Sequence, residues 1–212
     1  MKTNIQWLFF DIGSTLVDEA LCYEDRYRRI TAGTEIPCEE FRARVIDYSR
    51  RNCKGDHLAA QEYGLPLPKW NSDLERVYPE ACSVLEVLAL RGYKLGIIAN
   101  QATGTKERLK RYGILHFFDV IVASAEEGVS KPDHRIFEIA LQQANCLPEE
   151  AVMIGDRLDN DIAPAKAIGM NTVWVKQGLG QYYTVRSDAE RPEETVGSLQ
   201  QLLDIFRVLG KR

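Results

Sequence analysis

The sequence predicts an α/β fold: a doubly wound, Rossmann-like parallel sheet with an inserted helical cap. Short apolar runs that end in polar residues recur along the chain, and helix-like stretches separate them, which is the pattern of βαβ units. One polar, helix-periodic stretch follows the first run and interrupts this alternation. We therefore assign residues 1–17 and 79–212 to the core domain and residues 18–78 to the cap subdomain.

Four apolar runs are the candidate strands that carry polar side chains. The first, residues 7–10, leads directly into Asp11, and a Gly-Ser-Thr sequence then turns the chain. The later runs are followed by Asn100 (run from residue 95), Lys131 (run from residue 121), and Asp156 with Asp161 (run from residue 151). Ligands of open α/β sheets bind at the carboxyl ends of the strands, so we expect these side chains to converge there.

The helices are predicted from spacing and from capping residues. In the cap, Pro37 suits a first helical turn, and apolar residues at helical spacing follow it. In the core, Thr103 and Thr105 are expected to cap a helix that runs to Gly113, and Ser198 is expected to cap a terminal amphipathic helix.

The composition is that of an ordinary globular protein of 212 residues, enough for one core and a subdomain. The net charge of −4 gives no basic patch, which argues against a nucleic-acid partner. Five cysteines without a Cys-x-x-Cys pair favour reduced thiols in the cytoplasm. No apolar stretch is long enough to span a membrane. The oligomeric state stays open.

The strand-end residues suggest phosphoryl chemistry by themselves. A carboxylate that attacks a phosphoryl group approaches an anion, so it needs positive charge nearby. Lys131 and a divalent ion held by Asp156 would supply that charge for Asp11 as the nucleophile, and Mg²⁺ is the ion that suits oxygen ligands and phosphate. The alternative is that these carboxylates only cap turns. Convergence of several at one sheet edge favours a site.

Four motifs in order extend this interpretation, and over essentially all 212 residues the chain resembles the haloacid dehalogenase-like hydrolase superfamily. They are Asp11-Ile-Gly-Ser-Thr15, Ala99-Asn100, Lys131-Pro132 and Gly155-Asp156-Arg-Leu-Asp-Asn160-Asp161. The resemblance implies a phosphatase of a small phosphorylated metabolite that works through an aspartyl-phosphate on Asp11. It implies catalysis by Asp11 and Lys131 and phosphate binding by Asn100 and Lys131. It also implies a C1 cap over the site, and Mg²⁺ on the Asp11 carboxylate, the Gly13 carbonyl, Asp156 and Asp161.

Two residues depart from the family pattern. Gly13 stands where phosphatases of the family have the acid/base aspartate, and a positioned acid/base typically contributes ~10²–10⁴-fold. Ala99 stands where they have a hydroxyl on the phosphoryl oxygens, and a hydrogen bond to a charged group is worth roughly 1.5–3 kcal/mol. Turnover is therefore expected to be slow unless another group substitutes. Asp18 and Glu19 are candidates for that group, or residues favoured at a helix start.

Other functions stay open at this point. A phospholigand-binding or regulatory protein would keep the pocket without efficient turnover, as Gly13 and Ala99 suggest. Phosphonatases of the family use a cap lysine, and Lys54 and Lys69 are the available ones, in no recognised motif. Dehalogenases of the family work without metal, so the intact motif at 155–161 argues against that chemistry.

Overall fold

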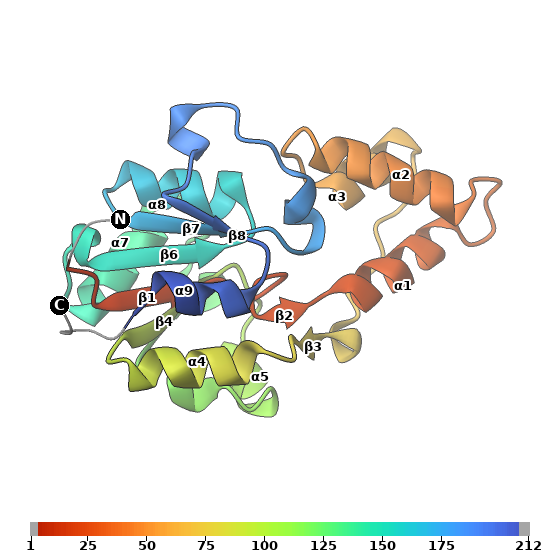
Figure 1. Ribbon diagram of the computed structural model, residues 1–212. Coiled ribbons are helices and arrows are strands. Elements are labelled where there is room, and N and C mark those ends of the chain that lie inside the picture. Colours follow the sequence, from red (N-terminus) through yellow and green to blue (C-terminus); the bar gives the residue numbers. More distant parts are fainter. Residues whose placement is uncertain (1–3, 208–212) are drawn as a thin grey trace.

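The central element is a six-stranded sheet, seen in a computed structural model that describes residues 4–207 (Figure 1). The strand order is β5-β4-β1-β6-β7-β8, and every pairing in this sheet is parallel. The strands are β1 (Trp7–Phe10), β4 (Lys94–Ala99), β5 (Val120–Ala123), β6 (Ala151–Gly155), β7 (Asn171–Val175) and β8 (Glu194–Val196). This confirms the doubly wound parallel sheet that the sequence predicts.

Helices cover both faces of the sheet, and the alternation of side chains along β1 shows why. Leu8 and Phe10 pack with α4 (Ala81–Leu90), α5 (Thr105–Arg111) and α9 (Leu202–Ile205) in one buried cluster. Trp7 and Phe9 point to the other face, toward α7 (His134–Ala144) and α8 (Ala163–Ala167). A strand buried on both faces must be apolar throughout, as β1 is. Each fully buried Phe or Leu contributes roughly 1.5–3 kcal/mol.

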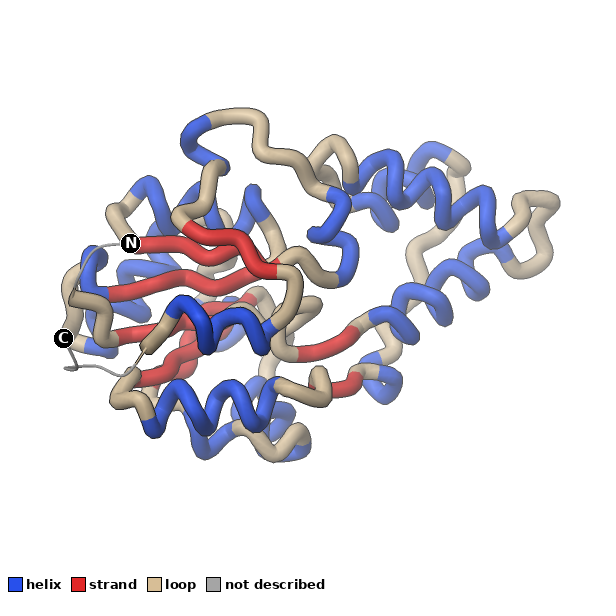
Figure 2. The backbone as a smooth tube through the Cα atoms, in the orientation of Figure 1, coloured by secondary structure: helices blue, strands red, loops and turns tan. Residues whose placement is uncertain are grey.

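An inserted group of helices lies beside the carboxyl ends of the strands (Figure 2). It contains α1 (Ala20–Thr31), α2 (Cys38–Ser49) and α3 (Gly55–Glu62). A core of its own holds these helices together: Tyr27, Ile30, Phe41, Val45, Ala59 and Ala60 are buried in it. The antiparallel pair β2 (Val17–Asp18) and β3 (Arg76–Val77) joins the two ends of the insertion. The chain therefore leaves and re-enters the core at one place.

Short helical segments make most of the remaining connections. They are α6 (Ser124–Glu127), the 3₁₀ turns Ser72–Leu74, Leu115–Phe117, Pro148–Glu150, Gly178–Tyr182, Asp188–Glu190 and Leu199–Gln201, and the π-helical turn Leu158–Ile162. The segment after β7 crosses back over the insertion, where Asn52 Nδ2 donates to the carbonyl oxygen of Thr184 at 2.8 Å. Tyr183 Oη donates to the carbonyl oxygen of Cys53 at 3.2 Å. Within residues 4–207, no helix is both long and apolar enough to cross a bilayer.

The predicted helix caps are wrong in detail. Gly104, with φ of +85°, stands at the N-cap of α5, because the chain enters this helix through a left-handed residue. Thr105 is the first helical residue, and its hydroxyl donates to the carbonyl oxygen of Ala102 at 3.3 Å instead of capping. Ser198 makes no side-chain capping bond, and the terminal segment begins as a 3₁₀ turn before α9.

Candidate active site

The carboxylate of Asp11 lies at the edge of the sheet where β1 ends. Its backbone N–H still donates to the carbonyl oxygen of Ile154 on β6 at 2.9 Å, so the residue is fixed by the sheet. The chain then turns at once, because Ser14 adopts a φ of +54° and its N–H donates to the carbonyl oxygen of Val17. The Asp11 side chain keeps 13% of its surface exposed. A carboxylate held this way can meet a ligand without moving the strand.

Lys131 lies beside that carboxylate, with its side chain buried. Its Nζ donates to Asp11 Oδ1 at 2.5 Å and to Asp161 Oδ1 at 2.6 Å. A third bond, of 2.9 Å, goes to the carbonyl oxygen of Ile98 on β4. Burial lowers the pKa of Lys131, but the two carboxylates raise it by more, so the net direction is upward. The ammonium is therefore a fixed positive charge between two acids.

Asn100 holds the backbone of the lysine. Its Oδ1 accepts from the Lys131 N–H at 2.8 Å, and its Nδ2 donates to the Lys131 carbonyl oxygen at 2.9 Å. This pair of bonds fixes Lys131 relative to the end of β4, a positioning contact that sequence reasoning missed. One amide hydrogen of Asn100 is used in this way, and Asn100 also lines the cavity in front of Asp11. The neighbouring Ala99 side chain is buried and adds no polar group.

Three carboxylates form a compact cluster at the same edge. One oxygen each of Asp11, Asp156 and Asp161 lies within 4.8 Å of the other two. Burial raises the pKa of Asp156 well above its ordinary value, and the charges of Asp161 and Asp11 raise it further. Burial also raises the pKa of Asp161, to about 6, against the lowering effect of Lys131. Clustered buried acids of this kind favour a cation, and an all-oxygen set fits a hard divalent ion such as Mg²⁺.

Gly155 makes room for one of these acids. A Cβ atom at this position would overlap the side chain of Asp161. The Asp161 Oδ2 atom also accepts from the Arg157 N–H at 3.0 Å, which closes the loop after β6. Gly155 of the fourth motif is thus required because the Asp161 side chain packs against it.

Glu19 is the group that faces Gly13. A Cβ atom built on Gly13 would lie 2.6 Å from Glu19 Oε1, so the glutamate carboxyl fills the space of the missing side chain. Ser14 Oγ donates to Glu19 Oε2 at 2.9 Å. Burial raises the pKa of Glu19 to about 8, with a further rise from Asp11 and despite the Ser14 bond. The helix-start role belongs to Asp18 instead, whose Oδ1 accepts from the Ala20 N–H at 2.9 Å.

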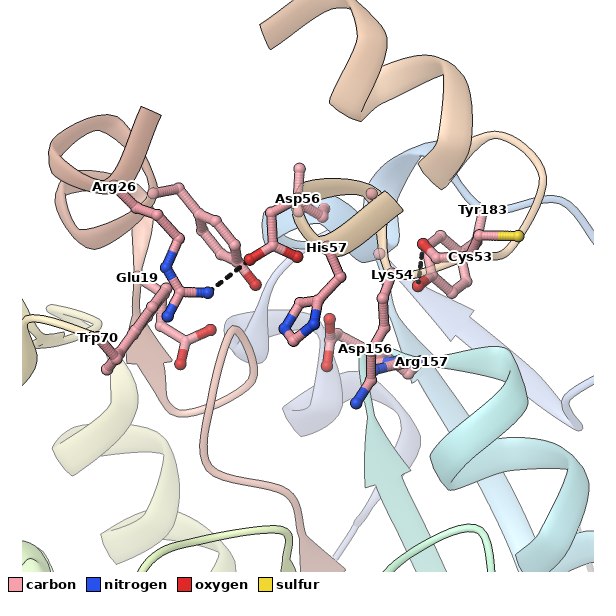
Figure 3. Close-up of a pocket in the computed structure, with 14 residues that line it drawn as sticks. Glu19, Arg26, Cys53, Lys54, Asp56, His57, Trp70, Asp156, Arg157 and Tyr183 are labelled. Carbon is pink, nitrogen blue, oxygen red and sulfur yellow. Dashed lines mark hydrogen bonds and ion pairs between the residues drawn. The ribbon is translucent and has the colours of Figure 1, made fainter. Parts of the chain in front are cut away.

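Two neighbouring cavities lead to this site. The one in front of Asp11 has a volume of about 160 Å³ and is also lined by Lys131, Asp156 and Glu19. The other, of about 270 Å³, lies between the insertion and the core and shares Glu19 and Asp156 with the first (Figure 3). Lys54 lines this second cavity from the insertion, whereas Lys69 lines neither.

The insertion supplies one wall of the larger cavity, and this wall contains a buried ion pair. Arg26 Nη1 lies 2.6 Å from Asp56 Oδ2, and the guanidinium lies 4.5 Å from the centre of the Trp70 ring. His57 of the insertion and Arg157 of the core line the same cavity (Figure 3). The insertion therefore encloses the outer part of the site with polar and aromatic side chains.

The strand-end carboxylates, the buried lysine and the parallel sheet agree with a match of residues 8–175 to the model of haloacid dehalogenase-like hydrolases. The chain belongs to this family. Among its relatives, the glyceraldehyde 3-phosphate phosphatase of Methanopyrus kandleri is 41% identical over 135 residues, which cover 63% of this chain and 58% of that protein. The enzyme of the same name from Pyrococcus abyssi is 34% identical over 196 residues, 82% of each chain.

A solved structure extends the agreement to the whole fold of the family. The crystal structure of a HAD phosphatase from Thermococcus onnurineus matches 97% of this chain and 100% of its own, with a TM-score of 0.65 and 27% identity. Of the curated relatives, several are covered only in part, since the matched region spans 58% of the Methanopyrus kandleri protein and 60% of the Methanocaldococcus jannaschii one. The assignment to the family rests on the match over residues 8–175 and on the relatives that cover most of the chain.

Proposed function

We propose that this protein is a Mg²⁺-dependent phosphatase of a small phosphorylated metabolite, with Asp11 as the nucleophile. The observation that carries the proposal is the 2.5 Å contact between Asp11 Oδ1 and Lys131 Nζ, within the acidic cluster at the sheet edge. It gives the carboxylate a fixed cation that offsets the negative charge of an approaching phosphoryl group. The phosphatase names of the relatives support the reaction class.

In this proposal Asp11 is the attacking group, and Lys131 and Asn100 bind the phosphoryl group. Asp11 attacks phosphorus and forms an aspartyl-phosphate, which water then hydrolyses. Lys131 binds a phosphoryl oxygen while it orients Asp11, and Asn100 keeps Lys131 in place and offers its other amide hydrogen to the phosphate.

The metal site of the proposal uses four groups of this chain. The Asp11 carboxylate, the Gly13 carbonyl and Asp156 would hold Mg²⁺, with Asp161 assisting directly or through water. When bound, the ion neutralises charge on the phosphoryl oxygens. Support for this assignment comes from the clustering of the three carboxylates within 4.8 Å of one another.

The insertion acts as the cap in this proposal, with residues 18–78 as the cap subdomain and residues 1–17 and 79–212 as the core. Its helices line the 270 Å³ cavity, which is small enough to suit a metabolite and unsuited to a polymer. The proposed location is the cytoplasm, where the five free cysteines would stay reduced.

A second candidate function is favoured by Gly13 and Ala99. With no hydroxyl at Ala99 and no acid at Gly13, the same pocket would serve a phospholigand-binding protein with little turnover. Such a protein would bind phosphorylated metabolites in the pocket but release no phosphate.

Phosphate release from a panel of esters separates the two functions. The panel holds glyceraldehyde 3-phosphate, phosphoserine and p-nitrophenyl phosphate, each assayed with Mg²⁺ and with EDTA. The parent should release phosphate only with Mg²⁺, and Asp11→Asn should abolish release while its circular dichroism stays unchanged. Asp119→Asn, an exposed change at the opposite end of β5, is the matched control and should behave as the parent. Release by Asp11→Asn at the parental rate would overturn the nucleophile.

A further inference from the structure

The space beside Gly13 is occupied, although glycine itself has no side chain. A Cβ atom on Gly13 would lie 2.6 Å from Glu19 Oε1, 3.0 Å from Glu19 Cδ and 3.1 Å from Glu19 Oε2. These distances are too short for a Cβ atom and a carboxyl group to coexist. The Glu19 carboxyl group therefore occupies the space that a side chain at Gly13 would fill, although Glu19 lies outside the turn after Asp11.

Two neighbours hold this carboxyl in place. Ser14 is buried, and its Oγ donates to Glu19 Oε2 at 2.9 Å. Ser14 has a φ of +54°, a left-handed conformation that belongs to the turn after Asp11. A Cβ atom at Gly178 would overlap the Ser14 hydroxyl, so that glycine leaves the room that the hydroxyl needs. The Glu19 rotamer is thus fixed by the turn and by the segment after β7.

Glu19 also faces the reacting groups. It lines the cavity that Asp11, Lys131 and Asp156 line, and the larger cavity beneath the insertion (Figure 3). Within residues 4–207, no arginine, lysine or histidine forms an ion pair with it. The Ser14 hydroxyl donates to Glu19 Oε2, and Glu19 Oε1 is the oxygen that lies nearest Gly13.

The neighbouring acid lacks these features. Asp18 lines neither cavity, and its Oδ1 accepts from the Ala20 N–H at the start of α1. The two adjacent carboxyl groups therefore have different surroundings, one at a helix start and one in the site. This contrast also provides a matched control.

We propose that Glu19 is a catalytic residue, the general acid and base of phosphate-ester hydrolysis in place of the side chain that Gly13 lacks. The assignment rests on the proposed phosphatase function.

In the first step, an Asp11 oxygen forms a bond to phosphorus while the bond from phosphorus to the ester oxygen breaks, and the Glu19 carboxyl gives its proton to that leaving oxygen. The products are an alcohol, the aspartyl-phosphate and the Glu19 carboxylate. In the second step, Glu19 takes a proton from a water molecule whose oxygen bonds to phosphorus. The bond from phosphorus to Asp11 breaks, so inorganic phosphate, the Asp11 carboxylate and protonated Glu19 result.

The test compares two leaving groups in Glu19→Gln, which keeps an oxygen acceptor for Ser14. A simple alkyl phosphate needs a proton on its leaving oxygen, so its kcat/KM should fall by ~10²–10⁴-fold. With p-nitrophenyl phosphate, the leaving group departs as an anion and kcat/KM should change much less. Because the second step still needs the base, p-nitrophenolate should appear as a burst of about one equivalent per enzyme, followed by slow turnover.

A second experiment tests whether an aspartate at Gly13 can replace the Glu19 carboxyl. Gly13→Asp alone should not raise turnover, because the new side chain and the Glu19 carboxyl compete for one position. The double variant Gly13→Asp with Glu19→Ala should recover alkyl phosphate hydrolysis that Glu19→Ala alone has lost. A purely structural role of Glu19 predicts no such recovery and no dependence on the leaving group.

The outcomes separate this assignment from the proposed function. An active parent, a leaving-group-dependent loss in Glu19→Gln and parental rates in Asp18→Asn support Glu19 as the proton-transfer group. An active parent with equal losses for both esters, or with no loss, overturns the assignment alone. A parent that hydrolyses no ester in the presence of Mg²⁺ overturns the proposed function and the assignment with it.

Discussion

Lys131 Nζ donates a hydrogen bond of 2.5 Å to Asp11 Oδ1, although 120 positions of sequence separate the two residues. Asp11 follows β1 and Lys131 follows the segment after β5, so the lysine side chain passes the end of β4, which lies between those strands. There its ammonium also donates to the carbonyl oxygen of Ile98. The pair therefore exists only when three strands of the sheet are assembled, which couples the charge balance of the site to the fold.

Removal of the lysine should destabilise the protein. Lys131→Met leaves the carboxylates of Asp11 and Asp161 without their buried cation, and loss of one partner of a buried ion pair typically costs about 3–5 kcal/mol. Urea unfolding in EDTA measures the effect, and Mg²⁺ should restore more stability to the variant than to the parent. Lys106→Met, on the exposed side of α5, is the control. Equal free energies of unfolding for the two variants would contradict the prediction.

Metal affinity should depend on Asp156 and be insensitive to Asp159. Asp156 belongs to the cluster with Asp11 and Asp161, whereas the Asp159 carboxylate pairs with the guanidinium of Arg157 at 2.5 Å. We expect calorimetric titration with Mg²⁺ to show at least about tenfold weaker binding for Asp156→Ala. Asp159→Ala should bind as the parent does. The metal site lies elsewhere if the affinity of Asp156→Ala is unchanged.

The pKa of Glu19 should appear in the pH dependence of stability. It rises from 4.5 to about 8 on folding, so the folded state binds more protons than the unfolded state between these values. The free energy of unfolding due to this group is therefore fully present below about pH 4.5 and is lost as the pH rises toward about 8. In EDTA, the free energy of unfolding of Glu19→Gln should fall less steeply with pH over this window. The difference in slope should correspond to up to about one bound proton. Parallel curves for parent and variant would rule out the raised pKa.

The contact between Asn52 and the segment after β7 should control opening of the insertion. Asn52 Nδ2 donates to the Thr184 carbonyl oxygen at 2.8 Å, and its Oδ1 accepts from the Thr184 N–H at 2.9 Å. Asn52→Gly keeps the φ of +59° accessible but removes both bonds, so hydrogen exchange at Thr184 should accelerate. Asn145→Gly replaces the asparagine with positive φ after α7 and serves as the control. Unchanged exchange at Thr184 would show that other contacts hold the insertion.

The strands β1, β4, β5 and β6 follow from the sequence because each is a short apolar run. The edge strand β8 does not, because two of its three residues are polar and exposed. β1 is buried on both faces, so Trp7 through Phe10 must all be apolar, and Asp11 marks its end. The helix starts were harder to predict. Gly104 precedes α5 in a left-handed conformation. The capping preferences of Thr103 and Thr105 do not predict that the chain enters the helix through this glycine.

The sequence by itself determined which polar residues converge, since carboxylates and a lysine that follow the apolar strands of a parallel sheet meet at the same edge of that sheet. The tertiary structure alone decided which of them touch. Asn100 bonds the backbone of Lys131, and Glu19, not Asp18, turns its carboxyl toward Gly13. These contacts depend on the register of neighbouring strands and on the left-handed turn at Ser14. Such geometry arises from packing between distant segments, which the pattern of residues along one chain does not contain.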